Sequence, residues 1–324
     1  MPLTSDTVNF CSSVSLDNCA DVEDFFQDQQ KQNYIPWFNK TLADQGFWTG
    51  VRLVDTPAND AGFQLFWNRI NQIFGGTINL LQFVSLMSIL SNEVRADFVP
   101  QSEKMGTAGH PGLAYLFDAI PGMKRSYNTL SGGRTAFDCF NDEGYISAHQ
   151  AKAVAVGLIR TTDVRWKGEV WPSGVPTSSN PAVSGFVIEA DFMKFRGRGF
   201  IQTTGRANYA ALIEFVQNYV GDSQTLNSFQ QQWKDKTIDQ IAFQSSNQDW
   251  DTLFGNTDLA VAAEAVRAHN ANSGGYLALS SDPAILNGTG EGSLFNMGHR
   301  IGGGTAYAEK FRDRVGAVLL ALQG

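Results

Sequence analysis

Apolar residues recur at helical spacing in long stretches of this 324-residue chain, whereas strict alternation of apolar and polar residues is rare. In the last of these stretches, residues 305–322, the helical spacing runs through Ala308, Phe311, Val315, Leu319 and Leu322. The same spacing marks residues 60–74, 77–92, 207–220 and 258–271. The best strand candidates, residues 163–170 and 186–192, are short. The pattern predicts a mainly helical fold with a small β element.

Composition excludes several classes of protein. The 43% share of hydrophobic residues is enough to bury a large core, which excludes disorder as the main state. The net charge of −8 disfavours phosphate binding, so we expect no nucleic-acid partner. The most apolar stretch, Leu80 to Leu90, is far shorter than the ~20 residues of a membrane span, and we expect no such span. The chain has no His-Glu-x-x-His or Cys-x-x-Cys motif, and we expect neither a metal nor another cofactor.

The N-terminus and the cysteines bear on where the protein acts. The first residues lack the basic start and apolar run of a secretory signal, so we expect synthesis in the cytoplasm without a signal peptide. Cys11, Cys19 and Cys139 are too few for a disulfide framework, and we expect them to be reduced and structural. A Cys11–Cys19 pair and a nucleophilic Cys139 are the alternatives.

Glu93 stands at the end of the apolar stretch, on the helical face that also carries Gln82, Leu86 and Ile89. A carboxyl group on an apolar face is partly desolvated, and desolvation favours its protonated form. A general acid needs that form near neutral pH. Glu93 is therefore a candidate proton donor, and the alternative is that it only ends the helix and reaches into water.

A second carboxyl group, Glu103, follows Glu93 after ten positions. Pro100 lies between them, prevents the helix from continuing and lets the chain turn back. One protonated and one ionised carboxyl group are the minimum needed to hydrolyse a glycosidic bond. Asp97 is a rival for the second role.

The most specific string in the sequence, FRGRGFIQTTGRANY, runs from Phe195 to Tyr209. It resembles the signature of the chitinases of glycoside hydrolase family 19 and of the related phage endolysins. In that signature Gly-Arg-Gly, an apolar residue, Ile-Gln and a polar tail ending in Asn-Tyr recur. Tyr34 to Asn39 resembles the opening helix of the family, and Phe295 to Gly304 resembles the Asn-Gly-Gly loop before its last helix. The resemblance runs, with interruptions, from about Tyr34 to Leu322.

The resemblance implies a lysozyme-like fold, mainly α of the α+β type, with two helical lobes around a substrate cleft and a small β element. It divides the chain into an N-terminal extension, 1–33, and a catalytic domain, 34–324, with an elaboration at about 105–190. In the family a glutamate ends a long buried helix and a second one follows, as Glu93 and Glu103 do here.

One departure from the family keeps other acids open for the second role. Family members usually continue from the first glutamate with Thr-Gly-Gly or Ser-Gly-Gly, whereas this chain has Val94, Arg95 and Ala96. The path toward Glu103 therefore differs, and the remaining candidates for the second carboxyl group are Asp97, Glu143, Glu169 and Glu189.

The signature also supplies candidate binding residues. Gly197 and Gly199 permit close backbone approach, while Arg198 between them can fork onto a carboxylate, either to brace the fold or to tune Glu93. The resemblance implies further contacts with the sugar. Gln202, Thr204 and Asn208 would line the subsite beside the scissile bond, and Thr204 and Asn208 would help Glu103 to hold the water. Tyr209 would either stack on the sugar or pack in the core. Asn296 would either bind an N-acetyl group or form a turn.

Together these features predict an enzyme, a peptidoglycan hydrolase that cleaves β-1,4 bonds between N-acetylated sugars. Glu93 would act as the acid and Glu103 as the base, with inversion if the carboxyl groups lie ~6.5–9.5 Å apart. A chitinase and a catalytically silent glycan-binding or virion structural protein are the alternatives. The expected partners are the glycan and an immunity protein. A third is the carrier that delivers the protein to the periplasm or cell wall, which would be a holin, a phage particle or a secretion system.

Overall fold

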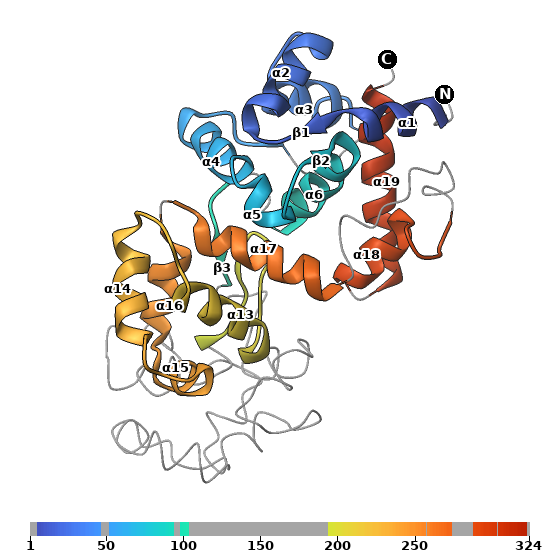
Figure 1. Ribbon diagram of the computed structural model, residues 1–324. Helices are drawn as coiled ribbons and strands as arrows, with labels where there is room; N and C mark the ends of the chain where they lie inside the picture. The colour runs from blue at the N-terminus through green and yellow to red at the C-terminus, as the bar shows by residue number, and fades with distance from the viewer. Residues whose placement is uncertain are drawn as a thin grey trace, which may run out of the picture. The chain divides into compact units, whose positions relative to one another are not determined.

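The computed structural model describes residues 5–46, 52–93, 98–103, 194–256, 258–273, 288–302 and 304–322. This part of the chain is mainly helical, as predicted, and its strands form two short two-stranded sheets (Figure 1). It divides into two compact units: unit 1 comprises Met1–Pro100 and Asp258–Gly324, and unit 2 comprises Gln101–Thr257. Several predicted features lie outside the described residues: both strand candidates, the elaboration at about 105–190, Cys139, Asp97, Glu143, Glu169 and Glu189.

Unit 1 combines the two ends of the chain. Its helices and strands are α1 (Ser5–Ser13), β1 (Ser15–Leu16), α2 (Cys19–Gln30), α3 (Tyr34–Phe38), the π-helix η1 (Asn39–Ala43), α4 (Pro57–Trp67), α5 (Ile70–Phe74), β2 (Ile78–Asn79), α6 (Leu80–Glu93), α17 (Ala260–Ser273), α18 (Leu294–Gly302) and α19 (Thr305–Leu322). Both α1 and α19 pack on α6, so the first and last described helices share one core. The antiparallel pair β1–β2 joins Leu16 to Ile78.

Helix α6 is the buried centre of unit 1. Every residue from Leu80 to Ser91 is buried except Gln82. Gln82 forms a capping box with Asn79, because each side-chain oxygen accepts a hydrogen bond from the other residue's backbone N–H, at 2.8 and 2.9 Å. The buried hydroxyl groups of Ser85 and Ser88 donate to the carbonyls one turn earlier, which satisfies them inside the core. These two serines are therefore accommodated in the buried part of the helix.

An aromatic cluster fills the space between α2, α3, α4 and α6. Tyr34 stacks on Phe63 with ring centroids 5.6 Å apart, and Phe26 lies 4.8 Å from Trp37. Phe83 of α6 meets the ring of Trp67 at 4.5 Å. Because α1 and α2 add Val8, Cys11, Val22 and Phe26 to this core, residues 5–30 are an integral part of unit 1.

Cys11 and Cys19 are free and buried, as predicted. Burial raises the pKa of each thiol to about 12, so both remain protonated at neutral pH. They behave as small apolar core residues.

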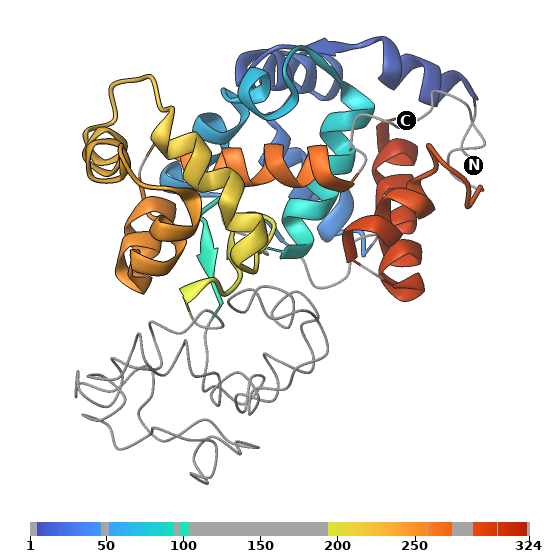
Figure 2. The ribbon, with the colours of Figure 1, turned by 60° about the horizontal axis from the view of Figure 1, so that its bottom comes forward.

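Helices α18 and α19 lie side by side (Figure 1, Figure 2). Gly298 makes this close contact possible, because a Cβ atom there would lie 2.9 Å from the Cα atom of Ala308 and 3.0 Å from the side chain of Phe311. This contact fixes the start of α19, the helix that packs against the end of α6.

Unit 2 is a set of helices around a second aromatic core. It contains β3 (Gln101–Ser102), β4 (Arg198–Gly199), α13 (Arg206–Gln217), α14 (Gln224–Trp233), α15 (Ile238–Gln244) and α16 (Asn247–Phe254). Tyr209 of α13 meets Trp250 of α16 edge to face at 4.7 Å, and Phe195 packs 5.0 Å from Tyr209. The core therefore anchors both sides of the Gly-Arg-Gly segment.

No helix in the described ranges combines the length and apolar character of a membrane span.

Candidate active site

Glu93 is half-buried at the last residue of α6, and α19 supplies its principal partner. The Tyr307 hydroxyl donates a hydrogen bond of 2.8 Å to Oε1 of Glu93. The side-chain amide of Asn92 donates to the same oxygen at 3.1 Å. Among the described residues no hydrogen bond reaches Oε2, so the two donors hold one oxygen of the carboxyl group and leave the other without a donor from this part of the chain.

Arg314 fixes the direction in which the Asn92 amide points. Its Nη1 atom donates to Oδ1 of Asn92 at 2.9 Å. Since this oxygen faces Arg314, the NH2 group of the same amide is turned toward Glu93. Two helical turns of α19, from Tyr307 to Arg314, thus control the position of one carboxyl group.

Glu93 was predicted as a site residue from the sequence, whereas its partners Tyr307 and Asn92 and the more distant Arg314 were not. The available signal was the helical stripe of α19, on which Tyr307, Phe311 and Arg314 are spaced to face a neighbouring helix. The sequence does not show that the neighbour is α6.

Replacing Tyr307 with phenylalanine removes only the hydroxyl group that holds Glu93. We expect kcat on the glycan substrate to fall about tenfold with little change in KM, because the hydrogen bond that positions Glu93 is lost while the substrate contacts remain. Steady-state kinetics would measure both constants. Tyr219→Phe is the matched control, because the same hydroxyl group is removed from unit 2, where it accepts from the backbone N–H of Ser223. Equal kcat values for Tyr307→Phe and the control would contradict a positioning role.

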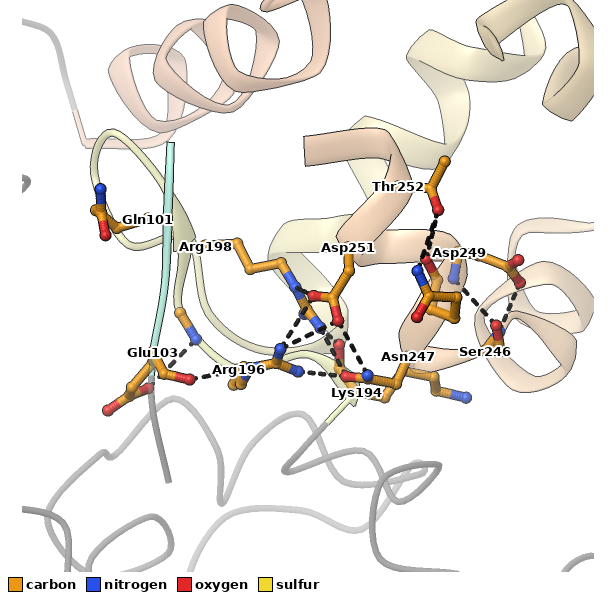
Figure 3. Close-up of polar contacts among 12 residues, drawn as sticks. Gln101, Glu103, Lys194, Arg196, Arg198, Ser246, Asn247, Asp249, Asp251 and Thr252 are labelled. Atoms are coloured by element: carbon orange, nitrogen blue, oxygen red, sulfur yellow. Dashed lines mark hydrogen bonds and ion pairs between the residues drawn. The ribbon is translucent and has the colours of Figure 1, made fainter. Parts of the chain in front are cut away.

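Glu103 lies in unit 2 at the end of β3, which pairs antiparallel with β4. The pairing continues past the strand, because the backbone N–H of Glu103 donates to the carbonyl of Gly197 at 2.8 Å. In return the N–H of Gly197 donates to Oε2 of Glu103 at 3.4 Å, and Nε of Arg196 donates to the Glu103 carbonyl at 3.0 Å (Figure 3). Glu103, the second predicted carboxyl group, is therefore hydrogen-bonded directly to the Gly-Arg-Gly segment.

The two glycines of this segment are used for close approach, as predicted. A Cβ atom on Gly197 would lie 2.8 Å from the side-chain oxygen of Gln202 and 3.2 Å from the hydroxyl group of Thr204. Gly199 has a φ of +84°, and a Cβ atom there would lie 2.9 Å from the ring of Phe254. Gln202, Thr204 and Glu103 thus gather around the backbone of Gly197.

The turn that carries Gln202 and Thr204 is held by its own hydrogen bonds. Gln202 has a φ of +53°, and its side-chain amide donates to the carbonyls of Gly199 and Gln101 at 3.3 and 3.4 Å. The Thr204 hydroxyl donates to the Gln202 carbonyl at 2.8 Å. Asn208, exposed in the first turn of α13, donates to the Thr204 carbonyl at 2.8 Å. All three predicted polar residues are therefore held by hydrogen bonds, and Gln202 and Thr204 lie beside Gly197, the residue that contacts Glu103.

Arg198 is fully buried, and its carboxylate partner is Asp251 of α16. Its Nε atom lies 2.8 Å from Oδ1 of Asp251, and its Nη2 atom donates to Asn247 at 2.8 Å (Figure 3). Arg196 binds the same Asp251, at 3.0 Å. Burial, followed by the neighbouring charge of Arg198, lowers the pKa of Arg196, while Asp251 opposes the shift. The interpretation that Arg198 braces the fold is the one that its contacts support.

Tyr209 is likewise fully buried, and its hydroxyl group donates to the Arg196 carbonyl at 2.7 Å. Neither Tyr209 nor Arg198 has surface to offer a sugar, so we assign both to positioning the segment. Asp251 and Asn247 were not found from the sequence. The only signal was that a buried arginine needs an anionic partner, which does not say where that partner lies.

Asn296 requires a correction. It does not lie in a glycine-rich loop or a turn, but in the first turn of α18. The hydroxyl group of Ser293 accepts its backbone N–H at 3.1 Å, which starts the helix before the glycines. Asn296 is half-buried in unit 1 and remains a candidate for sugar binding.

The candidate residues thus form two groups. Unit 1 holds Glu93 with Tyr307 and Asn92, and unit 2 holds Glu103 with Gly197, Gln202, Thr204 and Asn208. In the part of the chain that the structure describes, no cluster of three or more His, Cys, Asp or Glu residues is arranged to hold a metal ion.

No model of a known protein family, no curated protein and no solved structure matches this chain.

Proposed function

We propose that the protein is a glycoside hydrolase that cleaves β-1,4 bonds between the N-acetylated sugars of peptidoglycan. The observation that carries this proposal is the pairing of Glu103 with Gly197, residues 94 positions apart in the chain. The signature segment and Glu103 are separate features of the sequence. Their direct contact supports one chemical site built from both.

In the proposed reaction Glu93 and Glu103 act on one glycosidic bond. Oε2 of Glu93 gives its proton to the leaving oxygen as the bond from that oxygen to the anomeric carbon breaks. A water molecule attacks the anomeric carbon and forms the new bond, while Glu103 accepts a proton from it. Attack from the face opposite the leaving group inverts the anomeric centre. A cleft between two helical lobes, as the resemblance implies, is part of this proposal.

The signature segment favours peptidoglycan over chitin as the substrate. The Thr-Gly-Arg-Ala-Asn-Tyr ending of the signature is closer to endolysins than to plant chitinases. The net charge of −8 disfavours unaided attraction to an anionic wall, which suits delivery by a holin, a phage particle or a secretion system. We propose that the protein acts in the periplasm or cell wall after such delivery, where an immunity protein could oppose it.

Zymography on purified cell walls and on glycol chitin tests the substrate class. We expect clearing in the wall gel and little in the chitin gel. Clearing of chitin alone would identify a chitinase. If purified, folded protein cleared neither gel, the enzyme proposal would fail, and binding to insoluble walls would then identify a glycan-binding protein.

A further inference from the structure

A small pocket lies between α6 and α19, next to Glu93. Its lining consists of Ser88, Asn92, Tyr307, Lys310, Phe311 and Arg314, and its free volume is about 10 Å³. A volume of this size admits one water molecule or a single oxygen atom. Tyr307 lines the pocket and also donates a hydrogen bond to Glu93, so one side chain links the pocket to the carboxyl group. Such a pocket suits the end of a polar group and excludes a sugar ring.

Two cationic side chains line this pocket. Lys310 and Arg314 are one helical turn apart on α19, and in the described ranges Lys310 takes part in no ion pair. Burial lowers the pKa of Lys310, the charge of Arg314 lowers it further, and Glu93 opposes both. Burial also lowers the pKa of Arg314, whose charge is favoured by Tyr307. The pocket is therefore lined by two cationic side chains, and one of them, Lys310, interacts electrostatically with Glu93.

The acids of α19 do not line the pocket. Asp313 forms its ion pair with Arg312, at 3.0 Å, and the exposed Glu309 is absent from the pocket lining. An anion is the ligand that this arrangement favours.

We propose that Lys310 and Arg314 bind a carboxylate of the wall glycan and so select an acidic glycan over a neutral one. This inference rests on the proposed function, since it places a substrate group beside Glu93. In peptidoglycan every second sugar carries a lactyl branch, which ends in a carboxylate or continues into a peptide with its own carboxylates. Chitin carries neither group. One oxygen of the carboxylate occupies the pocket, and the two cations bind its charge.

Binding experiments on the full chain test this site without using activity. The probes are N-acetylmuramic acid, N-acetylmuramoyl-L-alanyl-D-isoglutamine and neutral N-acetylglucosamine, measured by ligand-observed NMR at low salt. We expect at least one acidic probe to bind about tenfold more tightly than N-acetylglucosamine, and the advantage to shrink as salt screens the charges. Preference for the first probe identifies the lactyl carboxylate, and preference for the second identifies a peptide carboxylate.

The double variant K310Q/R314Q should lose the preference for acidic probes. Arg312→Gln is the matched control, because it removes a cation from the same helix outside the pocket, and it should keep the preference. Equal affinity of the wild type for acidic and neutral probes, or an undiminished preference in the double variant, would overturn the inference. Circular dichroism of each variant excludes misfolding as the cause. The experiment measures binding and does not depend on activity. An inactive wild type would therefore refute the proposed hydrolase, while the preference for acidic probes could still be interpreted.

Discussion

Replacing Glu93 with glutamine is expected to lower kcat on wall glycan by about 10²–10⁴-fold, the usual loss when a general acid is removed. Glutamine keeps the size of the side chain and an oxygen that can accept from Tyr307, so the end of α6 should stay in place. What it lacks is a transferable proton. Steady-state release of reducing ends would measure the loss, and KM should change little because the sugar contacts are retained.

Two comparisons make this result specific to Glu93. Glu309→Gln is the matched control, since Glu309 is an exposed carboxylate on α19. The activity of this variant should equal that of the wild type. A nitrophenyl glycoside has a leaving group that needs no protonation, so it should restore turnover to the Glu93 variant. It should not restore turnover to Glu103→Gln, in which the water is not activated. Near wild-type turnover of Glu93→Gln on wall glycan would refute its role as the acid.

Replacing Asp251 with alanine is expected to destabilise unit 2 by about 3–5 kcal/mol, because it leaves a buried charge without its partner. Arg198 has no exposed surface and Arg196 has almost none, and both donate to Asp251. Removal of the carboxylate takes the ion-pair partner from the fully buried Arg198 and leaves its guanidinium group desolvated. Urea unfolding, followed by tryptophan fluorescence and by hydrogen exchange of the α13 and α16 amides, would measure the change in the free energy of unfolding.

Asp235→Ala provides the control for this measurement. Asp235 is an exposed acid of the same unit, and its replacement should change stability by no more than about 0.5 kcal/mol. Arg198→Lys should also destabilise unit 2, because an ammonium group cannot reproduce the planar set of donors that reaches Asp251, Asn247 and the Lys194 carbonyl. Equal stability of Asp251→Ala and the control would show that the network does not hold the segment.

The helical class and several helices were predictable because burial leaves a periodic pattern in the sequence. Residues 305–322 form α19 with the predicted bounds. The predicted helix at 60–74 is broken into α4 and α5 at Asn68 and Arg69, and the side chain of Asn68 accepts the backbone N–H of Cys19 at 3.2 Å. That contact joins residues 49 positions apart, and no local pattern contains it. Residues 77–79 likewise leave the predicted helix at 77–92, because β2 pairs with β1.

The candidate site divides in the same way. The sequence was enough to propose Glu93, Glu103 and the polar residues of the signature. A carboxyl group at the end of an apolar helix and a Gly-Arg-Gly string can both be read from it directly. Tyr307, Asp251 and Asn247 could not be proposed in this way, since each acts through a tertiary contact with a segment far away in the chain. Asn296 was misplaced because the glycines at 298 and 302–304 suggested a loop, whereas the cap at Ser293 begins a helix.

The central claim is that Glu93 and Glu103 together hydrolyse a β-1,4 bond of peptidoglycan. Purified glycan strands incubated with the protein would be followed by proton NMR during the first turnovers and then analysed by mass spectrometry. The account predicts new reducing ends on N-acetylmuramic acid that first appear in the α configuration, as inversion of a β bond requires. Reducing ends that first appear as the β anomer would contradict the inverting roles, and the absence of any new reducing end from folded protein would contradict the hydrolase itself.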